Sequence, residues 1–211
     1  MTRQAMHKLT FQGSELDIMR DGRLLESTIG KIIPVWNLPR DIVSSGTERI
    51  AKLQVQDNQL FVNELNILGL SDPSLDIDGV KPVEQFRERP TRDRDRRKGI
   101  TTDTIVESTW WFKYKSLNIH IPFSGKMLVG KPYSKELPYL VWHEMYPYVC
   151  DPIVRLTFSG GDVTRVEDFS DEARQIRASL SENFYELSDE QKKITGKFRV
   201  KVENITDDDV L

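Results

Sequence analysis

The sequence predicts a mainly β fold: an antiparallel β-sandwich or barrel with one or two helices around residues 170–195. Three observations lead to this expectation: short segments that alternate apolar and polar residues, closely spaced turn dipeptides between them, and one long apolar stripe with helical spacing near the C-terminal end. About ten strand-like segments against one or two helical ones argue against an alternating βαβ fold. We expect a single domain that spans residues 1–211.

The first turn signal is Asp21-Gly22, because both residues tolerate the positive φ of a tight two-residue turn. It predicts a hairpin between residues 16–19 and 23–26.

A further strand is expected over residues 31–36, where Pro34 cannot donate a ladder hydrogen bond and therefore favours an edge position. The clearest hairpin covers residues 53–65, where apolar and polar residues alternate on both sides of Asp57-Asn58.

The segment from residue 104 to residue 123 is strongly β-prone, and its apolar residues change parity midway. The first set shares one strand face: Trp110, Phe112 and Tyr114. The second set has the opposite parity: Leu117, Ile119, Ile121 and Phe123. A slip of one residue predicts a β-bulge or a bend between two strands. A third hairpin is expected over residues 153–166, around Gly160-Gly161.

The C-terminal part carries the predicted helices. Ser170 is expected to cap the first, whose apolar stripe comprises Ala173, Ile176, Leu180, Phe184 and Leu187. A capping box from Ser188 to Gln191 predicts a short second helix that ends at Gly196. The alternation of apolar and basic residues over 197–202 predicts a final strand.

Composition favours a soluble intracellular protein. Hydrophobic residues make up 38% of the chain and charged residues 30%, and no apolar run approaches the ~20 residues of a membrane-spanning helix. The N-terminal residues lack the apolar stretch of a signal peptide. Cys150 is the only cysteine, so the chain can form no internal disulfide. We therefore expect a cytoplasmic or nuclear location rather than secretion.

No motif for catalysis, metal binding or phosphate binding is complete, so we predict no catalytic residue, no metal site and no cofactor. His143 lacks the second histidine of a helical zinc site, and its proximity to Cys150 in sequence supplies no third catalytic member. Asp72, Asp76 and Asp78 lack the spacing of a calcium loop.

The basic segment of residues 87–99 is the one feature that suggests a function. Over residues 87–98 it holds seven cations against three acids, a net charge of +4 in a chain whose total is −3. We expect a flexible loop rather than a packed strand or helix. The predicted polyanion-binding residues are Arg87, Arg89, Arg92, Arg94, Arg96, Arg97 and Lys98, because guanidinium groups bind phosphates and release condensed counterions. A solvated charge run is the alternative.

Aromatic residues predict either a surface or a pocket. Trp110, Trp111, Phe112 and Tyr114 follow this segment closely, and Trp142 is the further candidate for a pocket. Exposed aromatics beside cations hold single-stranded nucleic acids. Aromatic side chains also dominate protein cores, and both interpretations remain open at this point.

Three functional hypotheses follow. The first is a non-enzymatic binding or assembly protein that engages a protein partner or its own copies, with the basic segment on a polyanion such as nucleic acid or an acidic membrane surface. A structural protein of a virus or other particle fits this pattern. The second is a β-barrel that binds a small apolar ligand. The third, an enzyme of unknown type, depends on the His143 and Cys150 neighbourhood alone.

Overall fold

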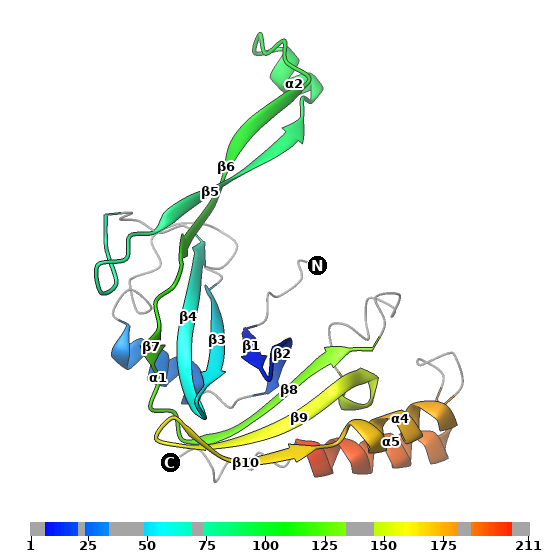
Figure 1. Cartoon of the computed structure of the whole chain (residues 1–211). Coiled ribbons are helices and arrows are strands. Elements are labelled where there is room, and N and C mark those ends of the chain that lie inside the picture. The colour runs from blue at the N-terminus through cyan, green and yellow to red at the C-terminus, as the bar shows by residue number, and fades with distance from the viewer. Residues whose placement is uncertain are drawn as a thin grey trace.

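The computed structural model describes residues 7–20, 24–33, 49–68, 74–133, 146–180 and 187–203. Within these residues, ten strands form one sheet in the order β10-β9-β8-β2-β1-β3-β4-β6-β5, with β7 beside β4. Figure 1 shows a curved body from which the hairpin of β5 and β6 projects, with the short helix α2 at its far end. The mainly β class, with helices at the C-terminal end, is confirmed.

The chain begins with a hairpin of β1 (Lys8–Phe11) and β2 (Ser14–Arg20), joined at Gln12 and Gly13, both of which have positive φ. The hairpin predicted at Asp21-Gly22 is wrong. Its turn residues lie outside the described part, and α1 (Leu24–Ile32) occupies the place of its second strand.

The helix α1 also replaces the start of the strand expected over residues 31–36, of which residues 34–36 are outside the described part. Leu25, Ile29 and Ile33 are fully buried. Their spacing of four residues places them on one helical face, and this face packs into the main core.

The hairpin predicted around Asp57-Asn58 is confirmed as β3 (Arg49–Gln56) and β4 (Gln59–Leu68). Both turn residues have positive φ, 50° for Asp57 and 64° for Asn58. The pairing of β1 with β3 is parallel, so the sheet is mixed rather than purely antiparallel.

The parity change in the β-prone segment is confirmed as a bend between β6 (Thr104–Tyr114) and β7 (Ile119–His120). Ser116 and Asn118 have positive φ in the connection, and both strands pair with β4.

The third hairpin is also confirmed. It joins β9 (Cys150–Ser159) to β10 (Asp162–Asp168) through Gly160 and Gly161. A single 3-10 turn, η2 (Pro147–Val149), precedes β9. On the edge of β9 opposite β10, β8 (Gly125–Pro132) pairs with it.

Seven strands close into a ring, because β10 at one end of the sheet also pairs with β4. The closure consists of hydrogen bonds from Leu60 N to Gly161 O at 2.9 Å and from Val163 N to Asn58 O at 2.7 Å. Of the two expected forms, this arrangement is closer to a barrel than to a sandwich. The strands β6 and β5 (Val83–Pro90) continue from β4 outside the ring.

Two helices cover the outer face of β8 and β9. The predicted first helix is α4 (Ser170–Ser179), but its N-cap is Phe169, and the Ser170 hydroxyl instead accepts a bond from Ile153 N at 3.1 Å. The helix is shorter than the predicted stripe because Leu180 adopts extended backbone angles. Phe184 lies outside the described residues, and Leu187 precedes the next helix.

The capping box at Ser188 and Gln191 is confirmed, but α5 (Asp189–Val202) continues through Gly196 and takes in the segment predicted as a final strand. Phe198 and Val202, four residues apart, are buried, whereas Val200 between them is 72% exposed. The alternation was therefore misleading, and burial on one helical face offsets the cost of about 1 kcal/mol for a glycine inside a helix.

The described residues form two hydrophobic cores. The main core fills the ring and takes side chains from the inner face of its strands and from α1. The second lies between the outer face of β8 and β9 and the two C-terminal helices. No helix in the described part of the chain is long and apolar enough to cross a membrane.

Candidate polyanion-binding arm

The hairpin formed by β5 and β6 is named here the arm (residues 83–114). β4 pairs only with the last four residues of β6, from Trp111 to Tyr114. Beyond Trp111, the arm therefore consists of two strands alone among the described residues. Figure 1 shows that it carries α2 (Asp93–Arg96) away from the ring.

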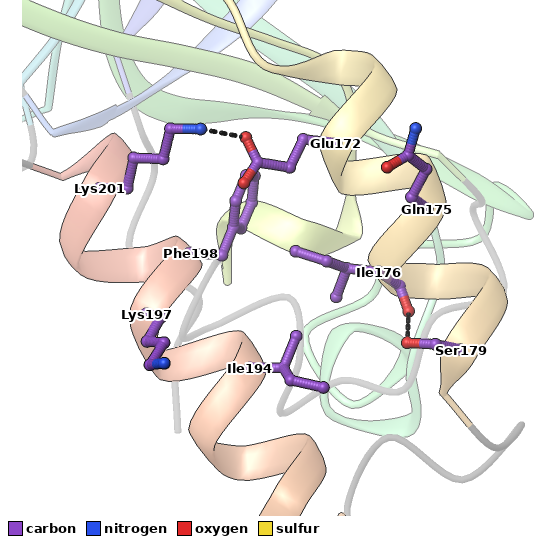
Figure 2. A pocket seen from close by; sticks show the side chains of 8 residues that line it. All are labelled: Glu172, Gln175, Ile176, Ser179, Ile194, Lys197, Phe198 and Lys201. Atoms are coloured by element: carbon purple, nitrogen blue, oxygen red, sulfur yellow. Dashed lines mark hydrogen bonds and ion pairs between the residues drawn. The ribbon is translucent and has the colours of Figure 1, made fainter.

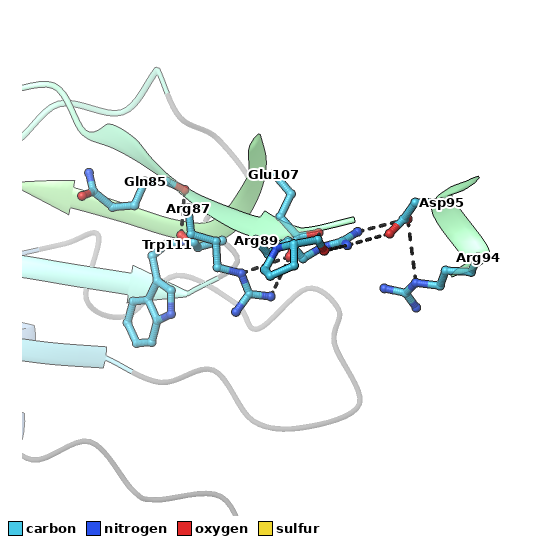
Figure 3. A network of polar contacts seen from close by, with 9 residues as sticks. Gln85, Arg87, Arg89, Arg94, Asp95, Glu107 and Trp111 are labelled. Atoms are coloured by element: carbon cyan, nitrogen blue, oxygen red, sulfur yellow. Dashed lines mark hydrogen bonds and ion pairs between the residues drawn. The ribbon is translucent and has the colours of Figure 1, made fainter. Parts of the chain in front are cut away.

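A network of ion pairs holds the outer part of the arm together (Figure 3). Arg89 donates from Nη1 and Nη2 to the two carboxylate oxygens of Asp95, at 2.6 and 3.2 Å, and from Nε to Glu107 at 2.6 Å. Arg87 donates from Nε and Nη2 to the other oxygen of Glu107, at 3.0 and 2.7 Å. The side chains of Arg89 and Asp95 are only 10% and 7% exposed, so each buried charge has its counter-charge.

The local sequence explains this network. Arg87 and Glu107 lie directly opposite each other in the register of β5 and β6, so their side chains share one face of the ribbon. Asp95 is the third residue of α2, and its carboxylate also accepts a bond from Arg92 N at 3.0 Å. This contact satisfies a free amide at the start of the helical turn.

The pairing shifts the pKa values of all three central groups. Hydrogen bonds, first from Arg89 and then from the Arg92 backbone, hold the pKa of Asp95 well below its usual range. Bonds from Arg89 and Arg87 lower the pKa of Glu107, and the two carboxylates raise the pKa of Arg89. The network therefore stays fully charged at neutral pH.

The end of the arm, residues 91–103, is named here the tip. It is closed by hydrogen bonds from Thr91 N to Asp103 O at 2.9 Å and from Ile100 N to Asp95 O at 3.2 Å, and Gly99 turns the chain with φ at 83°. The expectation that the basic segment forms no strand or helix is therefore wrong. Asp95, within the segment, and Glu107, opposite it on β6, neutralise Arg87 and Arg89 and so let this part of the segment pack.

The seven predicted polyanion-binding residues divide into two groups. Arg87 and Arg89 lie on β5, and both are engaged by acids of the arm. The other five are exposed at the tip: Arg92, Arg94, Arg96, Arg97 and Lys98.

The tip cations have few acidic neighbours. The Arg94 guanidinium lies 4.0 Å from a carboxylate oxygen of Asp95, and the Arg96 guanidinium lies 4.0 Å from one of Asp103. The tip exposes two acids, Asp93 and Asp103, against its five cations. It is thus a concentrated positive surface at the end of a projecting ribbon.

The predicted aromatic set is divided as well. Phe112 and Tyr114 are buried in the main core, and the Tyr114 hydroxyl donates to Leu75 O at 3.0 Å. Trp111 is half-buried, and Figure 3 shows it on the side of the arm toward which Arg87 points. The side chain of Trp110 and the whole of Trp142 lie outside the described part. The described aromatics therefore form no continuous exposed surface.

The other face of the arm exposes apolar side chains that sequence reasoning missed. Phe86 is 60% exposed and Val106 is 66% exposed. They share a face, because Phe86 pairs with Ser108 and Val106 pairs with Glu88. The sequence signal for this face is weak, because Phe86 is the single apolar residue among residues 84–88.

The cysteine is poorly placed for chemistry. Cys150 is fully buried, with its Sγ 3.7 Å from Met19 Sδ, and burial raises the pKa of its thiol to about 12. The thiol therefore stays protonated and unreactive at neutral pH. His143, its suggested partner, lies outside the described residues.

A groove lies between α4 and α5. Figure 2 shows side chains of both helices facing each other across it. It is lined by Glu172, Gln175, Ile176, Ser179, Ile194, Lys197, Phe198 and Lys201. Its one carboxylate, Glu172, accepts a bond from Lys201 Nζ at 2.5 Å. The groove thus presents apolar contacts and lysines, but no pair of groups arranged for acid–base chemistry.

Within the described part of the chain, no three His, Cys, Asp or Glu side chains lie close enough together to hold a metal ion. Comparison with protein-family models, with curated proteins and with solved structures gave no significant match.

Proposed function

We propose that this protein is a non-enzymatic binding protein whose arm presents the basic tip to a polyanion, and that the polyanion is a nucleic acid. The observation that carries the proposal is the division of charge in the arm. Arg87 and Arg89 are neutralised within the network, while five cations remain exposed at the tip. Cations so placed reach a phosphate backbone without desolvating the protein body.

The tip favours a nucleic acid over a membrane surface. A membrane-binding tip gains affinity from apolar side chains that enter the lipid, in addition to its cations. The exposed apolar residues Phe86 and Val106 lie instead on the strands of the arm. Four of the five tip cations are arginines, whose planar guanidinium matches phosphate oxygens in pairs.

The test is binding of a labelled mixed-sequence nucleic acid, followed by fluorescence anisotropy, to the wild type and to two triple variants. The tip variant carries Arg94→Ala, Arg96→Ala and Arg97→Ala. The control variant carries Lys192→Ala, Lys193→Ala and Lys197→Ala on α5, which removes the same charge from the body.

We expect the tip variant to lose affinity, and its dependence of log Kd on log salt to fall by about one for each cation that contacts a phosphate. The control variant should keep most of the wild-type affinity. Equal losses in the two variants, or binding to phosphatidylserine vesicles but not to nucleic acid, would refute the proposal.

A second candidate function, self-association, is favoured by the apolar face of the arm. A two-stranded ribbon is marginally stable on its own, and a two-fold interface needs only one self-complementary patch. Phe86 and Val106 supply such a patch. Light scattering coupled to size-exclusion chromatography should show a dimer that Phe86→Ser converts to monomer, whereas Val200→Ser on α5 should not.

A further inference from the structure

From the shape of the arm and the placement of its charges, we infer that its ligand is double-stranded B-form DNA, with the tip in the major groove. This inference rests on the proposed function, and it names the class of nucleic acid that the same site would accept.

The dimensions of the arm agree with this groove. Neighbouring strands lie ~4.8 Å apart, and a helical turn with its side chains is roughly 10–12 Å across. The major groove of B-DNA is about 12 Å wide and about 8.5 Å deep, and it admits either a helix or a two-stranded ribbon. The arm is a two-stranded ribbon that ends in the helical turn α2.

The arm is also long enough to reach into the groove. Its free part runs from Phe86 to Pro90 on β5 and from Thr104 to Ser108 on β6. Five strand residues span roughly 16 Å, which exceeds the depth of the groove. The ring can therefore stay outside the duplex while the tip lies between the two backbones, an arrangement consistent with the projection seen in Figure 1.

The directions of the cations favour a groove over a flat track of phosphates. Successive residues of a helical turn are rotated by about 100°. Arg94 and Arg96 lie within α2, and Arg97, its C-cap, keeps right-handed helical angles. The three side chains therefore leave the turn in different directions. Phosphates on both walls of a groove can meet them, whereas a single strand runs past one side only.

The tip lacks what a single strand needs. Proteins that hold single strands stack the bases on aromatic side chains. Residues 91–103 contain no aromatic residue, and Trp111 lies at the base of the arm, seven residues from Thr104, the residue of β6 next to the tip. Double-stranded RNA is disfavoured for another reason, because its major groove is too deep and narrow for protein elements to enter.

The deciding experiment measures the affinity of the full chain for three labelled probes of one length and sequence: duplex DNA, single-stranded DNA and duplex RNA. The wild type, the tip variant and the α5 control variant are compared in one low-salt buffer. A parallel competition uses methyl green, which occupies the major groove, and netropsin, which occupies the minor groove.

We expect duplex DNA to bind about tenfold more tightly than either other probe, a difference that is lost in the tip variant and kept in the control. Methyl green should compete and netropsin should not. Equal binding of the three probes with full dependence on the tip, or competition by netropsin alone, would overturn this inference and leave the proposed function standing. Binding that is absent, or unaffected by the tip substitutions, would overturn both.

Discussion

Arg89 and Asp95 face each other across the junction between β5 and α2, joined by two hydrogen bonds of 2.6 and 3.2 Å. The bonds tie the end of a strand to a helical turn six residues later. Because Arg89 also bonds Glu107 on β6, a single side chain connects the three segments that form the outer arm.

The first prediction concerns Arg89 itself. Arg89→Ala leaves Asp95 and Glu107 as neighbouring carboxylates without their shared partner, so the tip should open more often. Trypsin cleavage within residues 92–98 should become about tenfold faster, because cleavage follows the population of the open form. Mass spectrometry of the early fragments measures the rate. Arg165→Ala is the matched control, since this arginine is 69% exposed on β10, and an equal effect there would contradict the prediction.

The second prediction concerns acid. Asp95 and Glu107 have lower pKa values in the folded chain than their ordinary values of 3.8 and 4.5. Groups of this kind stabilise the folded state fully above the ordinary pKa, and this contribution is lost as pH falls through the lowered one. Hydrogen-exchange protection of the tip should therefore hold from neutral pH to the ordinary carboxyl range and weaken below it. Asp95→Asn should have weak protection already at neutral pH, and unchanged protection in that variant would argue against the network.

The third prediction compares two adjacent glycines in the turn that helps to close the ring. Gly161 has φ at +95°, and an added Cβ would lie 2.5 Å from His120 Nε2 and 2.6 Å from Ile121 O. Gly160 has φ at +59° with nothing within 4 Å. Gly161→Ala should lower the free energy of unfolding by about 3 kcal/mol, and Gly160→Ala by about 1 kcal/mol. Both substitutions place alanine at a positive φ, but only the Gly161 substitution also brings a Cβ into a steric clash. Urea denaturation measures both, and equal effects would contradict the described closure.

The fourth prediction tests the helical state of the C-terminal segment. Gly196 lies inside α5, and a Cβ there would meet nothing within 4 Å. Gly196→Ala should raise the free energy of unfolding by roughly 0.5–1 kcal/mol, because alanine loses less backbone freedom in a helix. If residues 197–202 formed a strand after a turn at Gly196, the same substitution would be destabilising in urea denaturation.

Local sequence patterns determined much of the strand framework. The turns at Asp57-Asn58 and Gly160-Gly161 and the bend before Ile119 depend on nearest neighbours, since they follow from positive φ and from side-chain parity. The capping box at Ser188 is local in the same sense. Composition and alternation were likewise sufficient for the mainly β class.

The errors fall where contacts distant in sequence outweigh local preference. The segments at α1 and at the end of α5 carry strand-like patterns, yet they fold as helices whose faces are buried on the ring and on β9. Arg155 shows how such contacts act, because it pairs with Glu167 and donates to Lys201 O at the C-terminal end of α5. A cation on a distant strand stabilises this helix end, and such a contact cannot be predicted from the sequence of the helix itself.

The basic segment illustrates both sides of this division. The sequence by itself located a concentration of cations and the aromatic strand beside it. The tertiary structure decided which cations pair with Asp95 and Glu107 and which stay exposed at the tip. Cross-strand register and the fold of α2 bring those two acids to Arg87 and Arg89. It also assigned Phe112 and Tyr114 to the core, since burial depends on what packs above a strand and not on its alternation alone.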